Sequence, residues 1–96
     1  MVIGLLKIEL YLDGNRSLKG KRQIVKSLID KIHSRFGNIS ISEVDSLDFW
    51  QKATIGISFV SNETPYVNSV LDKVLSFINS TGLVQITDQE LEIMHF

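Results

Sequence analysis

The chain has 96 residues, of which 44% are hydrophobic and 22% are charged, and its formal net charge is -1. This length supports one hydrophobic core, so we expect a single domain over residues 1–96. There is no cysteine, which excludes disulfides and thiolate chemistry and is typical of a reducing cytoplasm. The apolar N-terminus carries Lys7 and Glu9 and lacks signal-peptide features, so we expect a cytoplasmic protein without a membrane segment.

The near-neutral average hides a strong separation of charge along the chain. Residues 14–37 contain seven basic residues and one acidic residue, a net charge of +6. Residues 38–96 contain two basic and eight acidic residues, a net charge of -6. Such an asymmetry bears on the choice of partner and indicates that one surface of the domain is basic.

The first third of the chain predicts a strand followed by a helix. Apolar residues at even positions from Val2 to Leu12 indicate a strand whose even face is buried. After the turn signal at residues 13–15, Ser17 is a helix N-cap and Gly37 a left-handed stop. Gly20 is a weak position in the first helical turn. The apolar stripe of this helix consists of Leu18, Val25, Leu28, Ile29, Ile32 and Phe36.

The middle of the chain predicts two strands joined as a hairpin. Residues 38–44 and 52–61 both alternate apolar residues with small or polar ones, which is typical of half-buried strands. Between them, the polar segment from Asp45 to Phe49 indicates a loop of several residues. We therefore expect an antiparallel pair whose outward residues on the second strand are Thr54, Gly56 and Ser58.

The last third predicts a second helix and a fourth strand. Thr64 and Pro65 form a cap and first-position pair, and the helix should end near Gly82. The apolar residues of the final segment change parity, which indicates a bulge or turn near Asp88 and Gln89. The element order is that of a ferredoxin-like βαββαβ fold, in which two helices cover one face of an antiparallel sheet with strand order 4-1-3-2.

This topology places the start of the first helix near the loop between the second and third strands. The bases there predict contact with RNA phosphates, and Trp50 or Phe49 could add stacking on a base. The expected RNA-binding residues are Arg16, Lys19, Lys21, Arg22, Lys26 and Trp50. A competing interpretation pairs Lys21 and Arg22 with Glu43, Asp45 or Asp48 and treats the other bases as a solvated helix face. It also uses a half-buried ring to anchor the hairpin.

The same segments carry a resemblance to a known family. The residues concerned are Ser17-Leu18-Lys19, Lys21-Arg22, Glu43-Val44-Asp45, Asp48, Trp50-Gln51 and Ala53. With this pattern the chain resembles the YlxP-like family of small bacterial domains of unknown function. The resemblance implies a ferredoxin-like fold and genomic association with translation and ribosome-maturation factors, but no reaction, cofactor or catalytic residue. Gly20 departs from the family's pattern, in which a charged or polar helix former stands at this position.

The uncovered face of the sheet offers a second function. It lacks the aromatic residues on the first and third strands with which RRM-type domains stack bases. It does carry apolar residues, which indicate an interface such as a sheet-to-sheet homodimer. The expected interface residues are Ile3, Leu5, Tyr11, Met94 and Phe96.

Little in the sequence supports an enzyme. Glu43, Asp45 and Asp48 could hold a hard cation or act as an acid and base pair, but their spacing matches no known metal motif. Neither His33 nor His95 has neighbours at a ligand spacing, and no nucleophile elbow or phosphate loop is present. We therefore expect a non-enzymatic binding domain with no metal or cofactor and no small-molecule substrate. Its expected partner is structured RNA, such as ribosomal RNA or a ribosomal particle, and the alternative is a protein-interaction or homodimerisation module.

Overall fold

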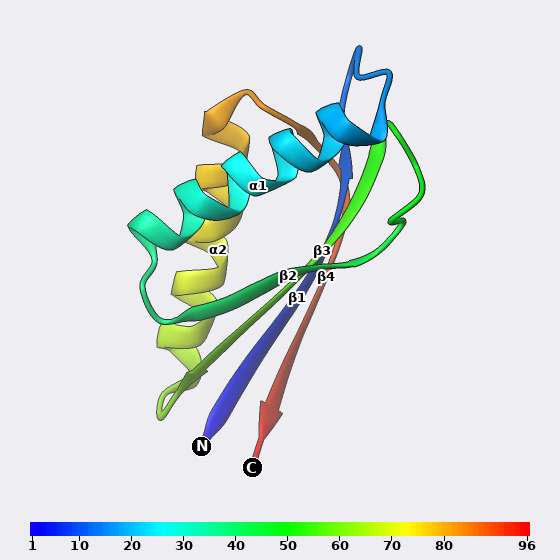
Figure 1. Cartoon of the computed structure of the whole chain (residues 1–96). Coiled ribbons are helices and arrows are strands. Elements are labelled where there is room, and N and C mark those ends of the chain that lie inside the picture. The colour runs from blue at the N-terminus through cyan, green and yellow to red at the C-terminus, as the bar shows by residue number, and fades with distance from the viewer.

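The computed structural model describes residues 1–96 and has two layers, a four-stranded sheet and two helices on one of its faces (Figure 1). All strand pairs are antiparallel and the strand order is β2-β3-β1-β4. The elements are β1 (Val2–Tyr11), α1 (Leu18–Arg35), β2 (Ile39–Asp45), β3 (Lys52–Ser61), α2 (Thr64–Thr81) and β4 (Gln85–His95). This is the ferredoxin-like arrangement and strand order that the sequence predicts. Neither helix is long and apolar enough to cross a membrane.

The core lies between the sheet and the helices and contains 17 buried hydrophobic residues. The even residues of β1 from Val2 onward are buried, as their alternation predicts. Each helix presents one stripe to this layer, because residues three and four positions apart share a helix face. The buried stripe of α1 is Lys21, Val25, Leu28 and Ile32, and that of α2 is Val67, Leu71, Val74 and Ile78.

Both helices differ from expectation at one end. Ser17 caps α1 as predicted, since its Oγ accepts a hydrogen bond from the Gly20 backbone N–H at 3.0 Å. Gly37 is not a left-handed stop, because α1 already ends in an extended conformation at Phe36. The N-cap of α2 is Glu63 rather than Thr64, which is itself the first helical residue. The α2 helix does end at Gly82, which has a left-handed φ of 68°.

The bulge predicted in the last strand is present in β4. Glu9 of β1 pairs with Asp88, whereas the next residue, Leu10, pairs with Ile86. Thr87 is therefore the extra residue of the bulge, and its hydroxyl donates a hydrogen bond to the Glu9 carbonyl at 3.3 Å. One inserted residue reverses which side chains of a strand face the helices, which explains the change of parity in the sequence.

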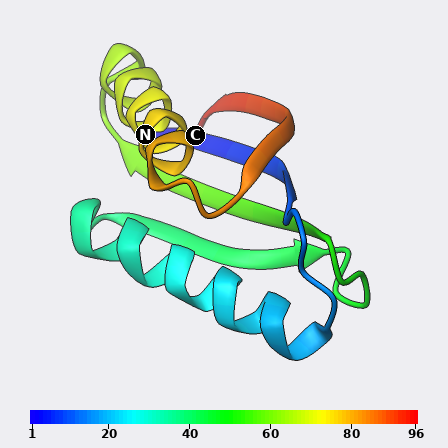
Figure 2. The ribbon, with the colours of Figure 1, turned by 90° about the horizontal axis from the view of Figure 1, so that it is seen from above.

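The turn before α1 and the β2–β3 loop lie at the same end of the sheet (Figure 2). This juxtaposition follows from the up-and-down path of the chain. It places the basic start of α1 beside the loop that carries Phe49 and Trp50.

Gly4 determines how closely α2 approaches β1. A Cβ atom at this position would overlap Val67 Cγ1 and lie 2.8 Å from Leu71 Cδ1. Since both partners are buried, neither can move away without disturbing the core.

We predict that Gly4→Ala destabilises the fold by about 1–3 kcal/mol, the usual cost of forcing extra volume into a packed core. Gly37→Ala is the matched control, because nothing lies within 4 Å of a Cβ at that exposed position. Urea unfolding of both variants measures the difference. Equal stabilities of the two variants would contradict this account of Gly4.

Candidate nucleic-acid interface

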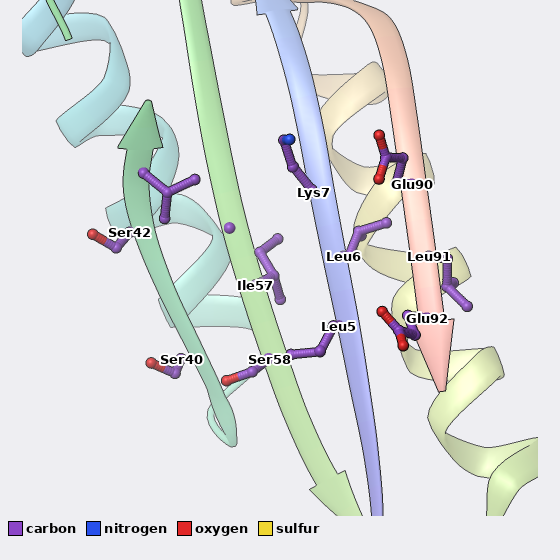
Figure 3. Close-up of a pocket in the computed structure, with 12 residues that line it drawn as sticks. Leu5, Leu6, Lys7, Ser40, Ser42, Ile57, Ser58, Glu90, Leu91 and Glu92 are labelled. Carbon is purple, nitrogen blue, oxygen red and sulfur yellow. The ribbon is translucent and has the colours of Figure 1, made fainter. Parts of the chain in front are cut away.

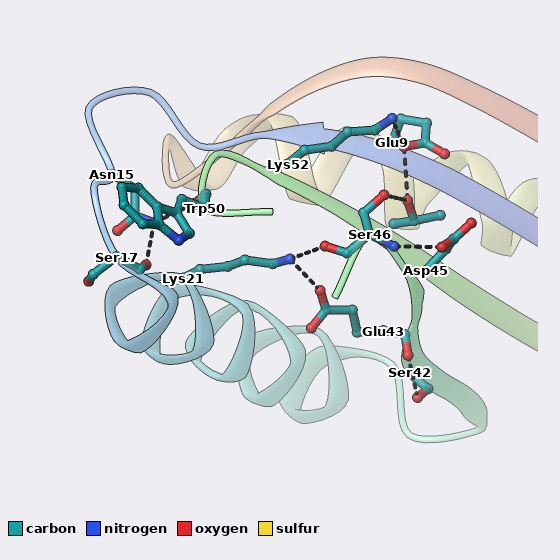
Figure 4. Close-up of polar contacts among 11 residues, drawn as sticks. Glu9, Asn15, Ser17, Lys21, Ser42, Glu43, Asp45, Ser46, Trp50 and Lys52 are labelled. Atoms are coloured by element: carbon teal, nitrogen blue, oxygen red, sulfur yellow. Dashed lines mark hydrogen bonds and ion pairs between the residues drawn. The ribbon is translucent and has the colours of Figure 1, made fainter. Parts of the chain in front are cut away.

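Lys21 is the first residue of the buried stripe of α1, and its side chain is only 1% exposed. Its ammonium reaches under the β2–β3 loop, where Nζ lies 2.9 Å from Glu43 Oε2 (Figure 4). The same Nζ donates a hydrogen bond to the backbone carbonyl of Ser46. Lys21 thus joins α1 to both the end of β2 and the loop that follows.

The partner of Lys21 is Glu43, one of the three carboxylates considered above as partners for the bases of α1. The Glu43 side chain is 16% exposed, and its Oε2 accepts no hydrogen bond of good geometry, so the contact is an ion pair. Asp45 has another role, because its Oδ1 accepts a hydrogen bond from the Ser46 backbone N–H at 2.7 Å. Asp48 is exposed and makes no ion pair.

Ser46 connects the Lys21 contact to the opposite face of the sheet. It is buried in a left-handed conformation with φ 61°, and its Oγ lies 2.9 Å from Thr54 Oγ1. Thr54 in turn donates to Glu9 Oε2 at 2.9 Å, and Lys52 Nζ lies 3.7 Å from the same oxygen. This chain of polar contacts attaches the start of the loop to both faces of the sheet.

The end of the loop is attached to the turn before α1. Asn15 Nδ2 donates to the carbonyl of Trp50 and, at 2.9 Å, to that of Ser17. The Leu12 backbone N–H donates to the Gln51 carbonyl at 2.8 Å. A Cβ atom at Gly20 would overlap Asn15 Oδ1, so this glycine is needed for packing. Gly20 is a weak position for helix propensity, and it also leaves room for the Asn15 side chain that joins the two segments.

Four of the predicted RNA-binding bases lie free on the surface. Arg16, Lys19, Arg22 and Lys26 are exposed, and no carboxylate lies within ion-pair distance of any of them. The first turn of α1 also lacks an acidic residue, so the positive end of the helix dipole is not offset locally. Lys21 must be removed from the predicted set, because its ammonium is buried and engaged by Glu43 and Ser46.

The two aromatic residues of the loop are both displayed to solvent. Phe49 is 59% exposed and Trp50 is 56% exposed, which disfavours the alternative that one ring anchors the hairpin. They border a shallow groove that also includes Arg16, Asp48 and Lys52. The Lys52 ammonium lies 5.9 Å from the centre of the Phe49 ring, within the range of a cation–π contact. Aromatic and basic groups thus meet at this end of the domain.

The predicted interface residues do not form one patch. Ile3 pairs with Val60 and Met94 near the chain termini, where Phe96 is 89% exposed. Leu5 is next along the same face. Tyr11 lies eight residues beyond Ile3 on β1, about 27 Å away, and borders the aromatic groove instead.

Between these ends, the uncovered face has a shallow depression (Figure 3). On one side, β2 and β3 contribute small residues, Ser40, Ser42 and Ser58. On the other side, β1 and β4 contribute residues with longer side chains. Among these are Lys7 and Glu90, which lie opposite each other in the register of the two strands. The centre of this face is therefore mixed, because polar and charged groups lie beside Val44 and Leu91, which are 54% and 41% exposed.

The geometry does not assemble a metal site. No group of three His, Cys, Asp or Glu residues is placed to hold an ion. Of the three carboxylates considered, Glu43 pairs with Lys21 and Asp45 caps the Ser46 amide, while Asp48 lines the aromatic groove. Two of these carboxylates hold the loop in place, and the third lines the groove beside it.

We predict that Lys21→Met lowers the free energy of unfolding by about 3 kcal/mol, because it leaves the Glu43 carboxylate largely buried without its counter-charge. Adding Glu43→Leu should restore most of this loss, since the buried charge is then removed as well. The control is Lys19→Met, which alters an exposed helix position and should change stability by no more than about 0.5 kcal/mol. Guanidinium unfolding measures all three, and equal effects of Lys21→Met and Lys19→Met would refute the anchoring role.

Comparison with known proteins finds relatives of unknown function. The family model "Protein of unknown function (DUF503)" matches residues 3–91. The "Uncharacterized protein YlxP" of Bacillus subtilis (strain 168) is 35% identical over 79 residues, which are 82% of this chain and 85% of that protein.

Among solved structures, the fold is similar to a de novo designed protein with ferredoxin fold, LFR1 1, with a TM-score of 0.54 at 13% identity over 98% of this chain and 84% of that one. It is also similar to the structural-genomics protein YJCS, with a TM-score of 0.55 at 9% identity over 97% of this chain and 99% of that one. These two likenesses concern the fold alone. The family match over residues 3–91 and the 35% identity to YlxP show that the chain belongs to the DUF503 family of proteins of unknown function.

Proposed function

We propose that this protein is a non-enzymatic cytoplasmic domain that binds structured RNA through α1 and the β2–β3 loop. The observation that carries the proposal is a set of four exposed bases without ion-pair partners: Arg16 in the turn before α1, and Lys19, Arg22 and Lys26 on α1. Lys21, by contrast, is buried and paired within the fold. Unpaired cations at a helix N-terminus are suited to phosphate oxygens.

The arrangement of acidic groups supports the same reading. An acidic loop beside α1 would repel a phosphate backbone unless its charges were neutralised. Glu43 is neutralised by Lys21, and Asp45 accepts a hydrogen bond from the backbone of Ser46. At this end of the sheet, Glu9 is also within ion-pair distance of Lys52. Asp48 remains exposed without a partner, and the four exposed bases outnumber the loop carboxylates that keep their charge.

Ribosomal RNA is the proposed target within this class. The support is the resemblance to the YlxP-like family, which implies genomic association with translation and ribosome-maturation factors. The chain's own residues support contact with phosphates and leave the choice of RNA to that resemblance.

We predict that Lys19→Glu together with Arg22→Glu abolishes cosedimentation with ribosomal particles from cell lysate at low salt. Replacing two phosphate-contacting cations with anions removes counterion release and adds repulsion, so binding should fall by about a hundredfold or more. The wild-type interaction should also weaken steeply as salt rises.

The matched control is Lys31→Glu with Lys73→Glu, which changes the net charge equally at exposed positions away from the start of α1. This pair should still sediment with the particles. If both double variants lost binding equally, only overall charge would matter and the α1 surface would be refuted. Absence of wild type from the particles at low salt would refute the ribosomal target.

A second candidate function, homodimerisation, is favoured by the apolar end of the uncovered sheet face. Val60 and Met94, which flank Ile3, are 54% and 46% exposed, and Phe96 extends the patch at the chain terminus. Under this alternative, sedimentation velocity at tens of micromolar should show a dimer that Met94→Lys converts to a monomer, because a charge would be buried in the interface. A wild-type monomer at that concentration would rule out this self-association.

A further inference from the structure

The groove at the β2–β3 loop displays two large aromatic rings on a fixed backbone. Phe49 and Trp50 are both more than half exposed, although they are among the largest apolar side chains of the molecule. The groove also contains two cations, Arg16 and Lys52, and one carboxylate, Asp48. Exposed aromatic rings beside cations are suited to a ligand that is itself flat, aromatic and anionic.

Hydrogen bonds fix the backbone of the loop at Phe49 and Trp50 and at the residue that follows. The Phe49 backbone N–H donates to Ser46 at 3.1 Å, the Trp50 carbonyl accepts from Asn15, and the Gln51 carbonyl accepts from Leu12. Ser46 is in turn held by Lys21. The rings are therefore presented by an ordered backbone, which lowers the entropy that a ligand must overcome on binding.

We propose that this groove binds an unpaired nucleobase of the RNA, stacked on Trp50, with the adjoining phosphate toward Arg16. The inference rests on the proposed RNA function and specifies its substrate as RNA with a single-stranded or bulged nucleotide beside a helix. A base inside a continuous duplex has both faces stacked and cannot reach the ring, whereas an unpaired base can. Asp48 repels phosphate, which places the backbone on the Arg16 side of the groove.

The charge pattern favours a nucleotide over an apolar protein segment. The groove continues into the basic surface of α1 through Arg16, so a chain with a phosphate at every residue can occupy both at once. An apolar peptide would satisfy the rings but leave Arg16, the groove cation that no carboxylate pairs, without a partner. The groove and α1 thus form one site, in which α1 holds the backbone and the groove selects for an unpaired base.

Trp50 is the only tryptophan of the chain, so its fluorescence reports directly on the groove. The test compares two RNA hairpins that differ only in a single bulged adenosine, and a non-nucleotide linker replaces the terminal loop of each so that no other base is unpaired. We expect the bulged hairpin to quench Trp50 emission and the perfect hairpin to bind without quenching. In anisotropy titrations with labelled hairpins, Trp50→Leu should weaken binding of the bulged hairpin about tenfold and leave the perfect hairpin unchanged, because only a base–ring contact is lost.

Tyr66→Leu is the matched control, since Tyr66 is 52% exposed on α2, away from the groove. It should leave both affinities unchanged. Equal binding of both hairpins without any effect of Trp50→Leu would overturn the groove inference while sustaining RNA binding by α1. Absence of binding to either hairpin would overturn both. Quenching by an apolar peptide and by neither hairpin would identify the groove as a protein-binding site and also overturn the inference.

Discussion

The surface described above depends on one buried contact, in which the Lys21 ammonium is held between Glu43 and the Ser46 carbonyl. Its partner groups belong to the end of β2 and the start of the β2–β3 loop, so the contact fixes the loop against α1. A buried ion pair of this kind is weak evidence for added stability, because desolvation offsets most of the attraction. The contact instead fixes the position of the loop relative to α1. If the loop moved away, Lys21 and Glu43 would be left buried without a partner, and this cost disfavours other arrangements.

The fold was largely predictable from the sequence because local patterns and topology agree. Alternation in β1 and the helical stripes define the elements, and the βαββαβ order leaves few arrangements of the sheet. The bulge in β4 was visible as a change of parity, although its position at Thr87 required the pairing with β1. The left-handed stop of α1 at Gly37 and the cap of α2 at Thr64 were wrong, since several neighbouring residues can end or cap a helix.

The sequence predicted which segments meet at the candidate site, but not how deeply each side chain is buried there. Helical spacing placed Lys21 beside the apolar stripe, but how deeply it is buried depends on where the β2–β3 loop closes over it. The role of Gly20 also depends on tertiary structure, because it packs against Asn15 from the preceding turn. That Phe49 and Trp50 are both exposed could not be inferred from alternation, which assigns adjacent residues to opposite faces only within a regular strand.

The central claim is that the Lys21 contact holds the β2–β3 loop in place, and amide hydrogen exchange measured by NMR tests it most directly. The reporter is the Phe49 amide, which donates to Ser46 within the loop, and the Ile8 amide in the core strand β1 is the reference. The account predicts that Phe49 is protected in the wild type and loses protection in Lys21→Met under conditions where Ile8 keeps it. A Phe49 amide that exchanges freely in the wild type, or equally in both proteins, would contradict the account.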